Sequence, residues 1–141
     1  MTFERKIIIG LDVGEKRIGV AWGDNDVKIA VPCGVIEMND EVVIQIEKMV
    51  EKLNVSTIVV GLPRNSSGEE TNQSKFVRDF IKRLKNIDTP IVFQDESLTS
   101  VQAENLLSNH KRSKKHNINK GEIDEIAASL ILQDYLEANF D

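Results

Sequence analysis

Three acidic residues stand where predicted core elements begin or end. Asp12 follows the apolar run at 7–11, Glu96 follows the run at 91–93, and Asp124 lies near the start of the last predicted helix. A carboxylate at the end of a core strand is costly unless it is paired or bound to a metal. Three such acids on one small sheet indicate a divalent-metal site, and we expect one or two Mg²⁺ or Mn²⁺ ions, which prefer oxygen ligands.

Asp124 shares a helical face with small and apolar residues. Ala127, Ala128 and Ile131 lie three, four and seven positions further along, on the same side of an α-helix. The alanines would let the helix approach the sheet closely and bring the carboxylate inward. The alternative is a first-turn acid that faces water and interacts with the helix dipole, a description that fits Glu125 better.

Glu96 leaves two possibilities open. It could be a ligand at the end of its strand, or a first-turn acid of the helix that follows. Its neighbour Asp95 competes with it for the inward position, because adjacent residues on an extended chain point to opposite faces.

Basic residues are concentrated between 110 and 120, although the chain carries a net charge of −5. The distribution of charge decides more than its total, and a basic segment on an acidic domain is typical of a phosphate binder. The alternative is a solvated surface loop. The turn after Asp12 adds two further candidates for phosphate contact. The predicted nucleic-acid-binding residues are Lys16, Arg17, Lys111, Arg112, Lys114, Lys115 and Lys120.

The composition is that of an ordinary globular domain. The chain has 141 residues, 40% hydrophobic and 29% charged, so we expect a single domain over 1–141. The single cysteine, Cys33, excludes an internal disulfide and is expected in the core. No stretch approaches the ~20 apolar residues of a membrane span, and the charged N-terminus lacks a signal-peptide core. These features favour a cytoplasmic protein with no membrane partner, as a monomer or weak dimer.

Hydrophobic patterns predict five strands and four helices. The strands are expected over 6–11, 17–23, about 27–36, 58–62 and 91–94. The helices are expected over about 42–53, after 67–70, over about 98–107 and over 121–138. This order predicts an α/β fold with a mixed five-stranded sheet, three antiparallel strands and then two parallel ones, and helices on both faces. Its site should lie beyond the carboxyl ends of the parallel strands.

Local signals refine three of these elements. Pro32 and Gly34 predict a bend or bulge in the third strand. Asn39 and Asp40 are the candidate N-caps of the first helix. The spacing of serine and glutamate in the segment 67–70 predicts a capping box for the second.

Four segments resemble the signature blocks of the YqgF family. They are DVGEKRIGVAWG (12–23), IVVGLPRNSSGEE (58–70), DESLTSVQAENLL (95–107) and NKGEIDEIAASLILQDYL (119–136). The match is collinear over nearly the whole chain. Members of this family are described as Holliday junction resolvases or pre-16S rRNA nucleases and have an RNase H-like fold. The resemblance implies that Asp12, Glu96 and Asp124 are the catalytic and metal-binding acids.

The resemblance implies a metal-dependent endonuclease that acts on structured nucleic acid, with processing of the 5′ end of pre-16S ribosomal RNA as the expected role. A Holliday junction resolvase-type nuclease, which cleaves branched DNA, is the alternative within this class. Two departures, Ser97 where the family commonly has Arg and Ala127 where resolvases carry a fourth acid, leave open a non-catalytic nucleic-acid-binding protein in ribosome assembly or transcription. An actin-like ATPase is disfavoured by chain length, because such enzymes close two domains around the nucleotide.

Overall fold

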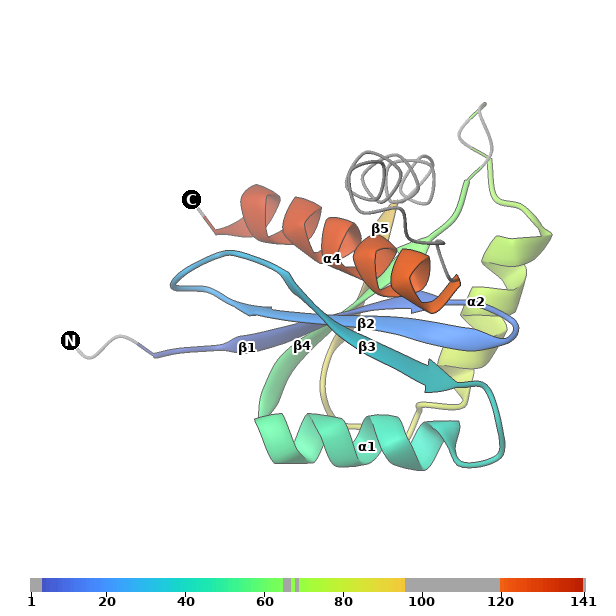
Figure 1. Ribbon diagram of the computed structural model, residues 1–141, viewed down its shortest axis with the longest axis horizontal. Helices are drawn as coiled ribbons and strands as arrows, with labels where there is room; N and C mark the ends of the chain where they lie inside the picture. Colours follow the sequence, from blue (N-terminus) through green and yellow to red (C-terminus); the bar gives the residue numbers. More distant parts are fainter. Residues whose placement is uncertain (1–3, 65–66, 68, 96–119, 141) are drawn as a thin grey trace, which may run out of the picture.

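A computed structural model describes residues 4–64, 67, 69–95 and 120–140, and it contains a five-stranded sheet of order β3-β2-β1-β4-β5 (Figure 1). The strands are β1 (Ile7–Val13), β2 (Arg17–Asp24), β3 (Val31–Glu37), β4 (Val55–Leu62) and β5 (Ile91–Asp95). The pairs β1–β2 and β2–β3 are antiparallel, whereas β1–β4 and β4–β5 are parallel. The predicted mixed sheet is therefore confirmed.

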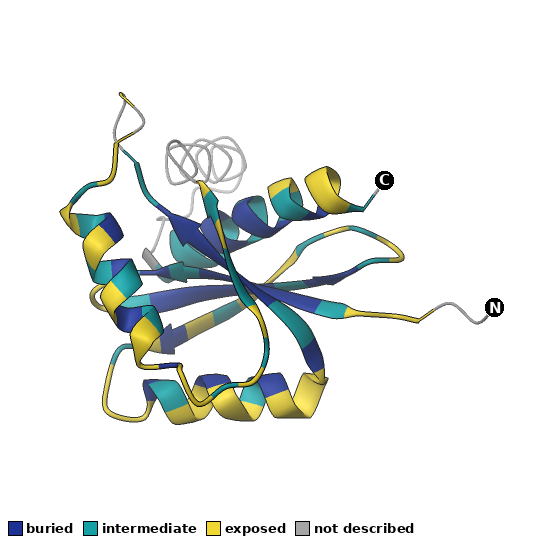
Figure 2. Cartoon of the chain, turned by 180° about the vertical axis from the view of Figure 1, so that it is seen from behind, coloured by how far each residue is buried: buried dark blue, intermediate teal, exposed yellow. Residues whose placement is uncertain are grey.

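Helices cover both faces of the sheet (Figures 1 and 2). The helices α1 (Val42–Leu53) and α2 (Asn72–Lys82) pack on one face, and α4 (Lys120–Asn139) packs on the other. The final helix agrees with its predicted bounds to one residue at each end. The helix predicted over about 98–107 lies outside the described residues. Within the described part of the chain, no helix is long and apolar enough to cross a membrane.

The alternation of β1 separates two cores. Ile9 and Leu11 are fully buried and belong to the core beneath α1 and α2. Ile8 belongs to the core beneath α4, together with Ala128 and Leu132. Because successive side chains of a strand point to opposite faces, Asp12 lies on the α4 face.

Glycines on the sheet let α4 approach closely. A Cβ atom at Gly10 would lie 2.8 Å from the Cβ of Leu132, and one at Gly19 would overlap the backbone carbonyl of Asp124. On the helix side, Ala127 and Ala128 are fully buried. The close approach predicted from these alanines is therefore present, with glycines opposite them.

Both predicted helix caps were misplaced. The capping box of α2 is formed by Thr71 and Ser74 rather than by the segment 67–70, because an isolated β-bridge between Arg64 and Glu70 keeps the chain extended up to the start of the helix. The N-cap of α1 is Glu41, without a side-chain cap bond.

The third strand differs from its prediction in three respects. It begins at Val31 rather than near residue 27, and the register of its pairing with β2 shifts opposite the segment 32–35. The predicted bulge is present, with Gly34 at φ 102°. Cys33 is exposed rather than in the core, because β3 is the edge strand and no helix covers this residue.

Candidate active site

Asp12 and Asp124 come together on the α4 face, at the carboxyl end of β1. Asp12 is the cross-strand partner of Gly19, and the Cα of Gly19 contacts the Asp124 backbone. Asp12 is partly buried, and the Asp124 side chain is 26% exposed. The structure therefore places two of the three predicted acids on one face of the sheet and at one level along it.

Arg17 reaches the same point from the start of β2. Its Nη1 atom lies 3.4 Å from Oδ2 of Asp124, and its side chain is 24% exposed. A surface pocket of about 400 Å³ opens beside this pair. Its lining is mostly polar and comes from the β1–β2 turn, α2 and α4: Gly14, Glu15, Lys16, Arg17, Gln73 and Asp124. Such a pocket can admit a solvated cation and a phosphate.

Gln73 is a pocket residue that sequence reasoning missed. Its Nε2 donates to the carbonyl of Val13 at 3.2 Å, and the neighbouring Ser74 hydroxyl donates to the carbonyl of Pro63. These bonds join the first turn of α2 to the ends of β1 and β4. Nothing in the sequence signals this, because the contact joins positions 60 residues apart.

Asp95 faces away from the two aspartates. Its Oδ1 accepts a hydrogen bond from Nε of Arg64 at 2.8 Å, on the side of the sheet that carries α2. There Arg78 contacts the ring of Phe93 at 5.0 Å and donates to Glu70, and these hydrogen bonds lower the pKa of the Glu70 carboxyl. Asp95 therefore does not compete for the third position of the site.

The family model described as "RuvX: Holliday junction resolvase" matches residues 6–138. A protein of Chloroflexus aurantiacus named "Putative pre-16S rRNA nuclease" is 43% identical over 136 residues, which are 94% of this chain and 88% of that relative. The chain belongs to the RuvX family. The resemblance to the YqgF family, which is the same group, is confirmed, and the assignment is to hydrolases that cleave phosphodiester bonds.

Two solved structures share the fold of this RuvX chain. Fowlpox virus resolvase, in complex with its Holliday junction DNA substrate, has a TM-score of 0.58 at 12% identity, over 96% of this chain and 99% of that one. Thermus thermophilus RuvC, in complex with a Holliday junction, has a TM-score of 0.57 at 10% identity, over 94% of each chain. The likeness confirms the predicted RNase H-like architecture.

The remaining predicted site residues of this RuvX chain are divided by position. Lys16 is exposed at the β1–β2 turn and lines the pocket. Lys120 is the first residue of α4, and its side chain is not described. The others lie outside the described residues: Glu96, Lys111, Arg112, Lys114 and Lys115. Among residues that the structure describes, no group of three potential ligands surrounds one point, as expected when only two of the three predicted acids are included.

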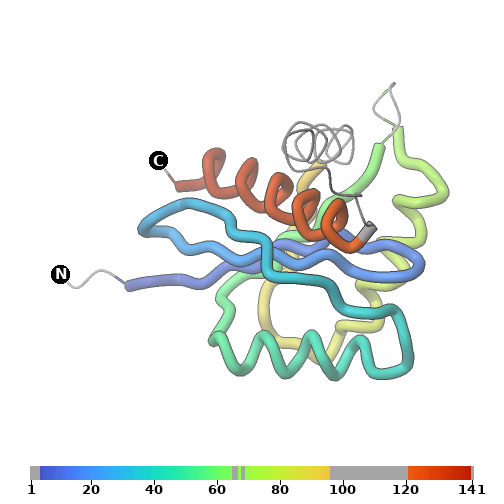
Figure 3. Tube along the Cα trace, in the orientation of Figure 1, coloured from blue at the N-terminus to red at the C-terminus, as the bar shows by residue number. Residues whose placement is uncertain are grey.

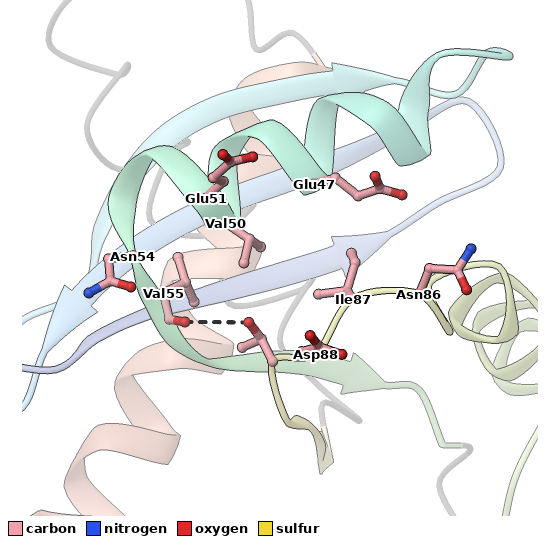
Figure 4. Close-up of a pocket in the computed structure, with 9 residues that line it drawn as sticks. Glu47, Val50, Glu51, Asn54, Val55, Asn86, Ile87 and Asp88 are labelled. Carbon is pink, nitrogen blue, oxygen red and sulfur yellow. Dashed lines mark hydrogen bonds between the residues drawn. The ribbon is translucent and has the colours of Figure 1, made fainter.

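Another pocket lies at the opposite end of the sheet of this RuvX chain (Figure 4). It has a volume of about 410 Å³ and is bordered by α1 and by the start of β4, where the Thr89 hydroxyl donates to the carbonyl of Val55 at 3.4 Å. Glu47, Glu51 and Asp88 make it acidic, without a basic side chain for a phosphate. The chemistry of the family therefore belongs to the Asp12 end.

Proposed function

We propose that this chain is a metal-dependent endonuclease whose site is built around Asp12 and Asp124. The observation that carries the proposal is their convergence beside a polar pocket in a member of a nuclease family. Two carboxylates offer the hard oxygen ligands that Mg²⁺ and Mn²⁺ take, so the residues present fit such an ion. When bound, a divalent ion supplies activation of water and stabilisation of charge on the leaving oxygen.

The chain's own residues would divide the remaining work. Asp12 and Asp124 hold the ion, and Glu96 is proposed as the third ligand because Asp95 is engaged with Arg64 on the other face. Lys16 lines the pocket and would contact the phosphate backbone. Since Ala127 is buried where resolvases carry a fourth acid, we propose that three carboxylates suffice here.

The proposed substrate is the precursor of 16S ribosomal RNA, cleaved near its 5′ end. The support is the name of a relative that is 43% identical over nearly the full length of both chains. Branched DNA is the second candidate, favoured by the description of the family model.

Cleavage of a panel of labelled substrates tests the function. The panel contains a precursor fragment that spans the 5′ end of 16S rRNA, a DNA four-way junction, and unstructured RNA and DNA of equal length, each with Mg²⁺, Mn²⁺ or EDTA. We expect metal-dependent cuts in the precursor fragment. Cuts in the junction alone would move the assignment to a resolvase. Tight binding without any cleavage would favour the non-catalytic alternative.

Paired variants test the residue roles in the same assay. Asp124→Asn and Glu96→Gln keep side-chain volume but remove a ligand charge, so the cleavage rate should fall at least about 100-fold. Their controls are Glu125→Gln, on the same helical turn, and Asp95→Asn, which faces the α2 side; both should stay within a few-fold of wild type. A catalytic Asp124→Asn protein would refute the assignment.

The basic segment is proposed to grip the backbone without taking part in chemistry. Replacing Lys111, Arg112, Lys114 and Lys115 with alanine should weaken binding and flatten its salt dependence by about 0.9 in slope per lost duplex phosphate contact. Cleavage at saturating substrate should change less. An unchanged affinity and salt slope would make this segment a solvated surface.

A further inference from the structure

The contact between Arg17 and Asp124 brings a cation of the chain itself into the proposed metal site. Arg17 begins β2 and lies on the same face as Gly19 and Asp124, at 3.4 Å from the carboxylate. Asp12 adds a second negative charge at the same level of the sheet. A guanidinium here lowers the repulsion between the two carboxylates when no ion is bound.

The geometry of this pair is that of an exchangeable contact. Both side chains are about one quarter exposed, and the 3.4 Å separation is longer than the 2.7–2.9 Å of a strong charge-assisted hydrogen bond. Ion pairs with such exposure contribute little to stability and are readily replaced. By contrast, Arg78 donates two hydrogen bonds to Glu70, at 2.6 and 3.0 Å, in the manner of a fixed pair.

We propose that Arg17 is a built-in counter-cation of Asp124 that a divalent ion displaces. This inference rests on the proposed metal site. In the metal-free protein, the guanidinium neutralises part of the charge of Asp12 and Asp124. When the ion binds, like-charge repulsion drives the guanidinium away from the carboxylate, toward the pocket lined by Gly14 and Lys16, where it can meet a phosphate oxygen. Arg17 is therefore a positioning residue whose partner changes with the state of the site.

A merely structural role for Arg17 predicts the opposite sign. If the guanidinium served only to hold Asp124 in place, removing it would loosen the carboxylate and weaken metal binding. If it competes with the ion, removing it should tighten metal binding. Affinity for Mn²⁺ alone, measured by calorimetry on the full chain, separates the two roles without any cleavage assay.

The variants are Arg17→Gln, Arg17→Lys and Lys16→Gln. Removing a positive charge beside a divalent ion should tighten Mn²⁺ binding on the order of tenfold in Arg17→Gln. Arg17→Lys keeps the charge and should remain within about threefold of wild type. Lys16→Gln removes the same charge from the same turn, but at an exposed position, and should also change the affinity less than about threefold. Equal or weaker Mn²⁺ binding in Arg17→Gln would overturn the proposal.

A double-mutant cycle in EDTA provides the second measurement. Arg17→Gln should lower the melting temperature of the metal-free protein by roughly 1–4 °C, and the effect should vanish in the Asp124→Asn background. An equal effect in both backgrounds would overturn the pairing itself. If wild type binds no Mn²⁺ while the cycle shows coupling, the proposed metal site fails and the exchange fails with it. If wild type binds Mn²⁺ and Arg17→Gln does not bind it more tightly, only the exchange fails.

Discussion

Strand β2 ends at Asp24, whereas its first residue, Arg17, lies against Asp124 near Asp12 at the other end of the sheet (Figure 3). Asp24 is only 4% exposed and accepts hydrogen bonds from the backbone N–H groups of Val27 and Asp26, at 2.8 and 3.0 Å, and from Arg5 Nε at 2.8 Å. Asp124 is one quarter exposed, and its contact with Arg17 is 3.4 Å.

The pKa of Asp24 shows what this difference means. Burial opposes ionisation of the carboxyl, but the hydrogen bonds from Val27, Arg5 and Asp26 outweigh it and hold the pKa below its ordinary value. The charge of Asp24 is thus used to close the β2–β3 turn. At the other end, two carboxylates lie side by side, an arrangement that costs stability unless a cation joins them. One strand therefore connects an aspartate that serves the fold with aspartates that we propose serve a metal ion.

The largest expected effect comes from breaking the site end at Gly19. A methyl group in Gly19→Ala would overlap the Asp124 carbonyl, so the start of α4 must move away from the sheet. We expect a loss of about 1–3 kcal/mol in the free energy of unfolding, as in other overpacked cores. Separating Asp124 from Asp12 should also abolish Mn²⁺ binding, and both quantities can be measured by urea denaturation and calorimetry.

Gly10→Ala is the matched control for this prediction. Its methyl group would meet Leu132 and Ala128, further along α4, and should also cost about 1–3 kcal/mol. Because Asp124 lies two turns away from Leu132, Mn²⁺ binding should survive. Equal loss of metal binding in both variants would mean that stability alone, rather than the position of Asp124, governs the site.

The second prediction breaks the fold end. Asp24→Asn keeps an oxygen for the two backbone N–H groups but loses the charge that Arg5 contacts, and it should destabilise the protein by about 1–3 kcal/mol at pH 7. Because the folded pKa of Asp24 is depressed, its contribution is complete above the unfolded value of about 3.9 and disappears as the pH falls through the folded value. Denaturation from pH 7 to pH 2 should show the two proteins converging only in acid. Asp26→Asn, at an exposed position, should change the free energy by less than about 0.5 kcal/mol throughout.

The sequence was sufficient for the sheet because period-two and period-3.6 patterns report burial directly, and for Asp12 and Asp124 because acids at the ends of apolar elements are rare. It was insufficient where a tertiary contact decides. The Arg64–Glu70 bridge moved the α2 cap to Thr71, and the edge position of β3 exposed Cys33. The pairing of Arg17 with Asp124 joins residues 107 positions apart, and no local pattern encodes it.

The smallest expected effect has the opposite sign and tests the comparison most directly. Asp12→Asn removes one of two neighbouring negative charges, so the metal-free protein should become slightly more stable, by up to about 1 kcal/mol, whereas the same substitution at Asp24 destabilises. The mutant should also lose most of the stabilisation that millimolar Mn²⁺ gives wild type by mass action. Thermal melts with Mn²⁺ and with EDTA measure both changes. If Asp12→Asn behaves like Asp24→Asn, losing stability in EDTA and retaining the Mn²⁺ shift, Asp12 serves the fold as Asp24 does, and the two ends of the sheet do not differ in purpose.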